Sequence, residues 1–233
     1  FLARVTGATR PEHSGARHTA VSPLTSYVHH RDQYSGMTNE YLSLASCYEE
    51  YEEWDKAEAV LKTALDHLPK PPWKIAREAD VYNHWGDLES KRGNYDKAKE
   101  KYKKAIQLYP TSNQPYGKHL LVKNVKVVQT KLDLLDYKTL DLSKIKNGVY
   151  KGSALGYKED VTATVTVKDG KISDIKVEHK EDIEQNASVI VPELIVKTQS
   201  LKVDAVSGAT TTSDAIVTAT FEALKSAGLE SAK

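Results

Sequence analysis

Cysteine is nearly absent from this sequence, because its 233 residues contain only Cys47. A single thiol excludes an intramolecular disulfide, a four-cysteine metal or iron–sulfur cluster, and the C-x-x-C-H attachment of a c-type haem. Any redox chemistry of this chain therefore needs a carrier other than cysteine.

An excess of one charge and a long apolar run are missing as well. The 33 Lys and Arg residues balance 32 Asp and Glu residues, so we expect no nucleic acid as a partner. No apolar stretch approaches the roughly 20 residues that span a bilayer, so we expect no transmembrane segment. The length suits two modest domains, each with its own core.

Residues 1–37 have the composition of an extended basic arm, rich in Gly, Ser, Pro, Arg and His. It has four arginines and only two acidic residues, Glu12 and Asp32, so its net charge is positive. The spacing of its histidines fits no pair on one helical face: His13, His18, His29 and His30. A flexible or partner-docked arm is therefore a better interpretation than a metal or haem site.

From Met37 the sequence takes on helical periodicity and contains an internal repeat. Residues 54–69 align without a gap with residues 95–110, an offset of 41 positions. Bulky residues surround small ones, as the crossing points of antiparallel helix pairs require. The small residues occupy equivalent positions in the two copies: Ala45, Ala57 and Ala64, then Gly86, Ala98 and Ala105.

This pattern resembles tetratricopeptide repeats, whose usual period is about 34 residues. The extra residues predict a longer connection between the copies, where Lys70-Pro-Pro-Trp73 marks a loop. We predict an all-α repeat domain at 38–137 that binds a partner; a plain helical bundle is the alternative. A last helix after Pro115 is expected to cap the array with one apolar stripe: Leu121, Val125, Val128, Leu132 and Leu135.

Near Tyr137 the period changes to two, which predicts strands. Residues 149–157 predict a first strand, whose glycines allow another backbone to approach closely. Asp169-Gly170 predicts a tight hairpin turn between two further strands. The middle strand alternates polar residues with four apolar ones: Val161, Ala163, Val165 and Val167. The sequence thus predicts a three-stranded antiparallel sheet.

Two helices are predicted after the sheet. The first covers 189–198 with Pro192 in its first turn, and the second begins at its N-cap Ser213 and ends before Gly228. The segment Asp204-Ala-Val-Ser-Gly-Ala-Thr210 lies between them and offers a hydroxyl just before a helix N-terminus. Unpaired N–H groups and the helix dipole favour a phosphate there.

Residues 145–228 resemble the FMN-binding domain family, which includes the flavin subunits of sodium-pumping NADH:quinone oxidoreductases. We therefore expect a small α+β FMN-binding domain with an antiparallel sheet at 138–233, which makes the chain multidomain. The resemblance is carried by Gly148-Val-Tyr-Lys-Gly152, the strand ending in Asp169-Gly170-Lys-Ile, His179-Lys-Glu181 and Asp204-Ala-Val-Ser-Gly-Ala-Thr210.

The resemblance implies that Thr210 carries FMN through a phosphoester bond made by a separate flavin transferase. Asp182 departs from the threonine that many relatives have there. Tyr150 and Tyr157 are candidates for an aromatic wall beside the flavin, although packing elsewhere is the simpler interpretation of each. The arm repeats the motif's last four residues as Thr6-Gly-Ala-Thr9 without the preceding aspartate, so Thr210 is the preferred site. The other expected cofactor-binding or loop-shaping residues are Asp204, Ser207, Gly208, Ala209, Thr211, Thr212, Ser213 and Glu181.

On this basis we expect an electron-transfer flavoprotein that docks through its helical repeats to a redox protein or membrane-associated complex. No catalytic or metal-binding motif indicates a second active site. The alternatives are a flavin-dependent reductase of a small substrate and a repeat scaffold with an empty flavin domain. A covalent tether retains a cofactor that would otherwise be lost. Since the family's transferase works outside the cytoplasm, we expect a bacterial periplasmic or cell-surface location.

Overall fold

Helices come first along the chain and strands second, as the change of sequence period predicts. The computed structural model describes residues 38–137 and 140–230, so the arm with its histidines and Thr9 lies outside the described residues. The helical part contains α3 (Thr38–Glu50), α4 (Trp54–Asp66), α5 (Lys74–Arg92), α6 (Tyr95–Leu108), the 3-10 turn η1 (Tyr109–Thr111) and α7 (Lys118–Leu134). The second part contains β1 (Gly148–Leu155), β2 (Asp160–Lys168), β3 (Lys171–Glu178), α8 (Ala187–Thr198) and α9 (Thr210–Ser226).

The small residues of the repeat lie where helices cross, as predicted. At Gly86 on α5, a Cβ atom would collide with the ring of Tyr102 on α6, so only glycine lets the two helices approach this closely. The five alanines of the pattern have no exposed surface: Ala45, Ala57, Ala64, Ala98 and Ala105. This confirms the tetratricopeptide-like packing of α3 on α4 and of α5 on α6.

The extra residues between the repeats are divided between a loop and a longer helix. The connection covers residues 67–73, and α5 begins at Lys74. The first helix of the first repeat begins at Thr38, and the equivalent position 41 residues later is Ala79. Helix α5 therefore starts five residues earlier than α3 does in its own repeat. Ala76, in this added segment, is buried in the same core as α6 and α7. The added turn is therefore helical because it buries apolar surface, which the loop prediction did not anticipate.

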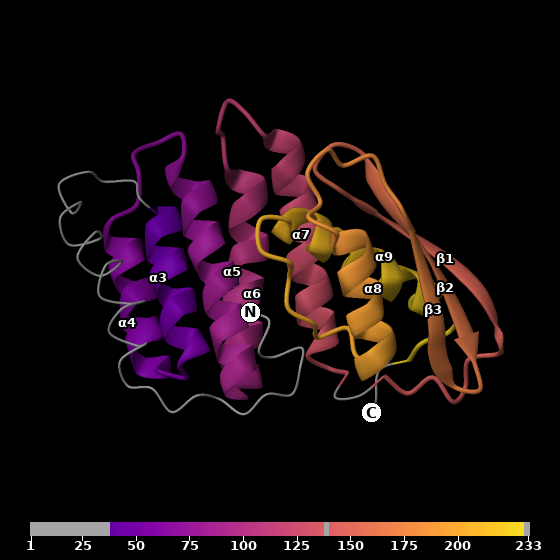
Figure 1. Ribbon diagram of the computed structural model, residues 1–233. Helices are drawn as coiled ribbons and strands as arrows, with labels where there is room; N and C mark the ends of the chain where they lie inside the picture. Colours follow the sequence, from indigo (N-terminus) through magenta and orange to yellow (C-terminus); the bar gives the residue numbers. More distant parts are fainter. Residues whose placement is uncertain (1–37, 138–139, 231–233) are drawn as a thin grey trace.

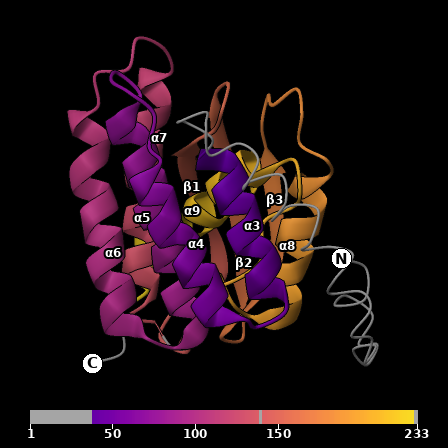
Figure 2. The same cartoon turned by 90° about the vertical axis from the view of Figure 1, so that its left-hand side faces the viewer.

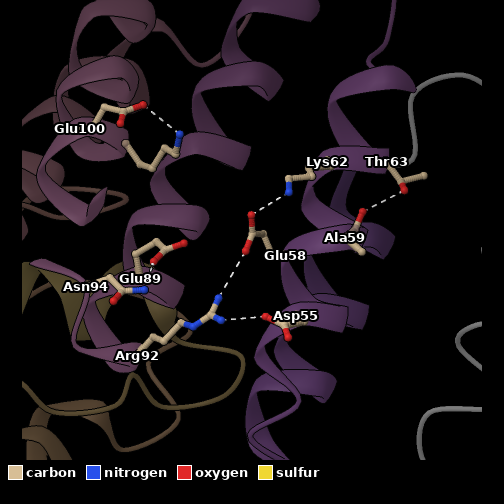
Figure 3. A network of polar contacts seen from close by, with 10 residues as sticks. Asp55, Glu58, Ala59, Lys62, Thr63, Glu89, Arg92, Asn94 and Glu100 are labelled. Carbon is tan, nitrogen blue, oxygen red and sulfur yellow. Dashed lines mark hydrogen bonds and ion pairs between the residues drawn. The ribbon is translucent and has the colours of Figure 1, made fainter. Parts of the chain in front are cut away.

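Polar contacts join the two repeats at the end of α5, as Figure 3 shows. Arg92 contacts Asp55 of α4 at 2.7 Å and Glu58 at 3.3 Å. Asn94 donates a hydrogen bond to Glu89 at 2.7 Å, across the turn where Gly93 takes a left-handed φ of 84°. Since these pairs are partly exposed, they orient the helices more than they stabilise them.

The sheet is antiparallel in the order β1-β2-β3, as predicted. The hairpin turn has positive φ at both central residues, 52° at Asp169 and 71° at Gly170. The four alternating apolar residues of β2 are at most 1% exposed: Val161, Ala163, Val165 and Val167. They face α8 and α9, which cover one side of the sheet (Figure 1).

Both predicted helix boundaries in this part were wrong at the N-terminal end. Helix α9 begins at Thr210 instead of after Ser213, because the left-handed Gly208 already ends the preceding loop. Helix α8 begins at Ala187, so Pro192 lies inside the helix and not in its first turn. The buried Ala187 belongs to the domain core, which favours the earlier start.

Helix α7 lies between the helical array and the second part of the chain, which contains the sheet, α8 and α9. It therefore does more than cap the array. One side buries Leu121 and Val128 with residues of α6, as the stripe predicts. On another side, Lys126 forms an ion pair of 2.7 Å with Glu222 of α9. In Figure 1, α8, α9 and the sheet lie on the far side of α7 from α3 and α4, which face the viewer in Figure 2. Among the helices of residues 38–137 and 140–230, none is both long and apolar enough to cross a bilayer.

Candidate functional site

The loop before α9 is held in place by its own turn and by Ser213. The N–H of Ala209 donates to the carbonyl of Val206 at 2.9 Å, which closes a turn that contains Gly208 with φ of 79°. The Ser213 hydroxyl donates to the carbonyl of Ala209 at 2.9 Å and accepts from the N–H of Val206 at 3.0 Å. Ser213 therefore lies in the first turns of α9 and fixes the loop from inside the helix, which corrects its predicted place at the N-cap; the N-cap is Ala209.

The first N–H groups of α9 are available to an anion. The first backbone hydrogen bond of the helix runs from Ser213 to the carbonyl of Ala209. In the part of the chain that the structure describes, no acceptor bonds the N–H groups of Thr210, Thr211 and Thr212, and no side chain caps the helix. Unbonded donors and the positive end of the helix dipole favour an anion such as a phosphate at this helix end.

A cleft of about 570 Å³ opens at this helix end. Its volume is within the range of small-molecule sites. Two of its side chains present exposed apolar surface, Tyr157 at 60% and Ile183 at 68%. Ten residues line it: Tyr157, Lys158, Glu181, Asp182, Ile183, Gly208, Ala209, Thr210, Thr211 and Thr212. The cleft thus brings together apolar surface and an anion site.

Six of the nine expected binding residues line this cleft, and three do not. Asp204 and Ser207 are exposed in the loop, and Ser213 is buried behind it. The charge of Asp204 acts on Lys91 of α5. Of the two candidate tyrosines, Tyr157 lies at the cleft, whereas Tyr150 donates its hydroxyl to the carbonyl of Lys146 at 2.8 Å.

Glu181 and Asp182 join two loops at the edge of the cleft. The Glu181 carboxylate accepts a hydrogen bond of 3.0 Å from the N–H of Lys158. The ammonium of Lys158 lies 2.9 Å and 3.1 Å from the two Asp182 oxygens. A Cβ atom at Gly156 would collide with the Glu181 carboxylate, so glycine leaves it the space. Lys158 and Ile183 had no sequence signal, because only the pairing of these loops brings them to the site.

A series of partly buried charged side chains extends from the helical array to α9 near the cleft. Asp87 of α5 accepts from Lys131 of α7 at 2.8 Å and from the Tyr102 hydroxyl at 2.8 Å. Burial alone would raise the pKa of Asp87, but the Lys131 ammonium, together with His84 and the Tyr102 hydrogen bond, holds this pKa below its ordinary value. Burial, aided by the like charge of Asp87, raises the pKa of Asp214 on α9, against the opposing charges of Lys131 and Lys123.

Replacing Asp214 with asparagine is expected to stabilise the protein more as the pH rises. The folded protein binds the Asp214 proton more tightly than the unfolded chain does. The contribution of Asp214 to wild-type stability therefore falls as the pH rises from the ordinary pKa of 3.8 through the raised folded-state pKa. Asparagine removes this loss, so the difference in unfolding free energy between D214N and wild type should grow with pH and then level off. Urea denaturation at several pH values measures it.

Asp87→Asn provides the contrast, because the pKa of Asp87 is lowered. The stability that Asp87 contributes is present above its ordinary pKa of 3.8 and disappears as the pH falls through the lowered value. D87N should therefore lose stability relative to wild type as the pH rises. A D214N difference that stays constant, or that follows D87N in sign, would contradict the assigned burial of Asp214.

The fold and the cleft define a small α+β flavin-type domain joined to a helical repeat array. Residues 156–225 match the FMN-binding domain family, and residues 79–112 match the tetratricopeptide repeat, which confirms both predicted resemblances and their order. The chain therefore contains a segment of the FMN-binding type and, before it, a helical segment of the tetratricopeptide type.

One relative has a sequence similar to part of this chain. It is an uncharacterized protein of Treponema pallidum (strain Nichols), 37% identical over 86 residues, a segment that makes up 36% of this chain and 24% of the relative. The chain therefore spans about a quarter of that protein's length. No solved structure matches the chain significantly.

Proposed function

We propose that this chain is an electron carrier that holds FMN covalently on the hydroxyl of Thr210. The observation that carries the proposal is the position of this side chain. Thr210 is exposed, lines the cleft, and is the first residue of α9, where three N–H groups have no acceptor among the described residues. A phosphate esterified at this oxygen would lie within the field of the helix N-terminus.

The attachment needs an activated flavin as the donor. A bond forms between the Thr210 oxygen and the phosphorus of the flavin phosphate, and the hydroxyl proton is released. The donor is a flavin dinucleotide, whose pyrophosphate bond breaks so that a nucleoside monophosphate leaves. No oxidation or reduction occurs in this step. In the described part of the chain no nucleotide-transfer motif is evident, so a separate transferase performs it.

The residues of the cleft suit the two ends of FMN. The N–H groups of Thr210, Thr211 and Thr212 would hold the phosphate, and Tyr157 and Ile183 would offer apolar surface to the ring. The Glu181 hydrogen bond to Lys158 keeps the two loops of the cleft together. FMN supplies one- and two-electron chemistry when bound, and the protein sets its orientation and potential.

An electron relay is favoured over a substrate reductase because the cleft is open. The side chains that flank it, Tyr157 and Ile183, are more than half exposed, so a second redox protein could approach the ring edge. In the described residues no group of three or more His, Cys, Asp or Glu is placed to hold a metal ion. We propose that the repeats dock such a partner, and that the chain works in the periplasm or at the cell surface of a bacterium.

Two measurements test this function. Mass spectrometry of the chain after co-expression with a flavin transferase should show one added flavin phosphate group, in the peptide that contains Thr210. The reduced protein should then be reoxidised rapidly by a redox protein of its host and slowly by small-molecule substrates. An unmodified chain would support the empty-scaffold alternative, and rapid turnover of a small substrate would support the reductase.

A further inference from the structure

Lys123 of α7 is a largely buried lysine that forms no close ion pair with another described residue. The residue is 4% exposed. Among residues 38–137 and 140–230, no acceptor or carboxylate lies within hydrogen-bond or ion-pair distance of its ammonium. A buried ammonium is unfavourable unless an anion compensates for its lost hydration. Its place in the fold therefore suggests an anion that comes from outside the chain.

The neighbours of Lys123 on α7 show which part of the molecule it faces. One turn before it, the His119 ring contacts the ring of Tyr157, a residue of the cleft, at 6.5 Å between centroids. Three residues after it, Lys126 pairs with Glu222 of α9 at 2.7 Å. Residues three and four apart share one helix face. Lys123 therefore lies on the face of α7 directed at α9 and the cleft.

Two carboxylates locate the ammonium more closely. Burial lowers the pKa of Lys123, while the negative charges of Asp214 and Glu181 act to raise it. Glu181 lines the cleft, and Asp214 stands one helical turn after Thr210, on the same face of α9. The charge of Lys123 thus interacts with one carboxylate that lines the cleft and with another on the first turns of α9.

We propose that Lys123 is the countercharge of the phosphate on Thr210, a proposal that rests on the function proposed above. The phosphodiester carries one negative charge, which the free N–H groups of α9 hold from one side and the Lys123 ammonium holds from another. A lysine acts here as a point charge at the end of a flexible stem. The flavin site then extends beyond residues 156–225 into α7, so the helical part completes the cofactor site.

The test compares Lys123→Met with wild type, each with and without the flavin. Methionine keeps an unbranched stem of similar size and removes the charge. In the unmodified chain K123M should change Tm little, because the variant loses the unfavourable burial of the charge together with its attraction to Asp214 and Glu181. In the flavinylated chain K123M should lower Tm, because the phosphate loses its partner. The increase in Tm on flavinylation should therefore be about 3–6 °C smaller in K123M.

Lys126→Met is the matched control, since Lys126 is on the same helix and is half exposed. It should change Tm equally with and without flavin. The ³¹P resonance of the phosphodiester should shift in K123M and stay in place in K126M. Equal effects of K123M on both forms, with an unmoved resonance, would overturn the proposal and leave Lys123 a structural partner of Asp214. Absence of flavin from the wild type would instead contradict the proposed function.

Discussion

Thr210→Ala is expected to yield a chain that carries no flavin. The substitution removes the oxygen that would form the phosphoester bond and leaves no hydroxyl at that position. Because the Thr210 side chain is exposed, the unmodified variant should keep its stability within about 0.5 kcal/mol. Intact mass and flavin fluorescence of the denatured, washed chain measure the loss.

Three further variants show whether the position or only the residue type matters. Thr210→Ser keeps a hydroxyl at the same place and should retain attachment. Thr211→Ala and Thr212→Ala leave Thr210 intact and should retain flavin on the chain. Flavin that persists in T210A would place the linkage elsewhere, and Thr9, in the arm outside the described residues, is the next position to examine.

Gly152→Ala is expected to displace α9 and destabilise the domain that holds the site. A Cβ atom at Gly152 on β1 would collide with the carbonyl of Ala219 and the backbone nitrogen of Ala223, both on α9. Since these are backbone atoms, they move only if the helix moves. Overpacking of this kind costs typically about 1–3 kcal/mol, and a shifted α9 also moves Thr210. Urea denaturation and the yield of flavinylated chain measure the two effects.

Gly148→Ala is the matched control on the same face of β1. The nearest atom to a Cβ atom there is the Tyr150 hydroxyl at 3.3 Å, at the end of a side chain that can move. G148A should therefore be nearly neutral in stability and in flavin yield. If G152A is as mild as G148A, the close contact between β1 and α9 does not determine the position of the helix.

Local pattern was enough to predict the elements on which the site is built. The alternation of β2, the turn at Asp169-Gly170 and the alanine spacing of the repeats depend on neighbours close in sequence, and all agree with the structure. Helix starts were less predictable. Ser213 has the chemistry of an N-cap, yet its hydroxyl bonds inside the first turns of α9, because Gly208 turns the chain earlier.

The composition of the cleft could be predicted only in part. The residues around Thr210 are contiguous in the sequence, so the motif identified them. Tyr157 and Ile183 lie on two other loops, which approach each other through the Glu181 hydrogen bond to Lys158. No periodicity marks such loop residues, since their environment depends on contacts between distant segments.

The sequence by itself determined the order of the domains, the pairing of the strands and the threonine that could carry a flavin, because each depends on a short, regular spacing of residue types. The tertiary structure decided where α9 begins, which side chains face Thr210, and that α7 packs on the flavin domain as well as on the repeats. Lys123 shows the physical reason. Its sequence position is that of an ordinary helix lysine, and it becomes a largely buried charge near Asp214 and Glu181 only when two separate parts of the chain pack together.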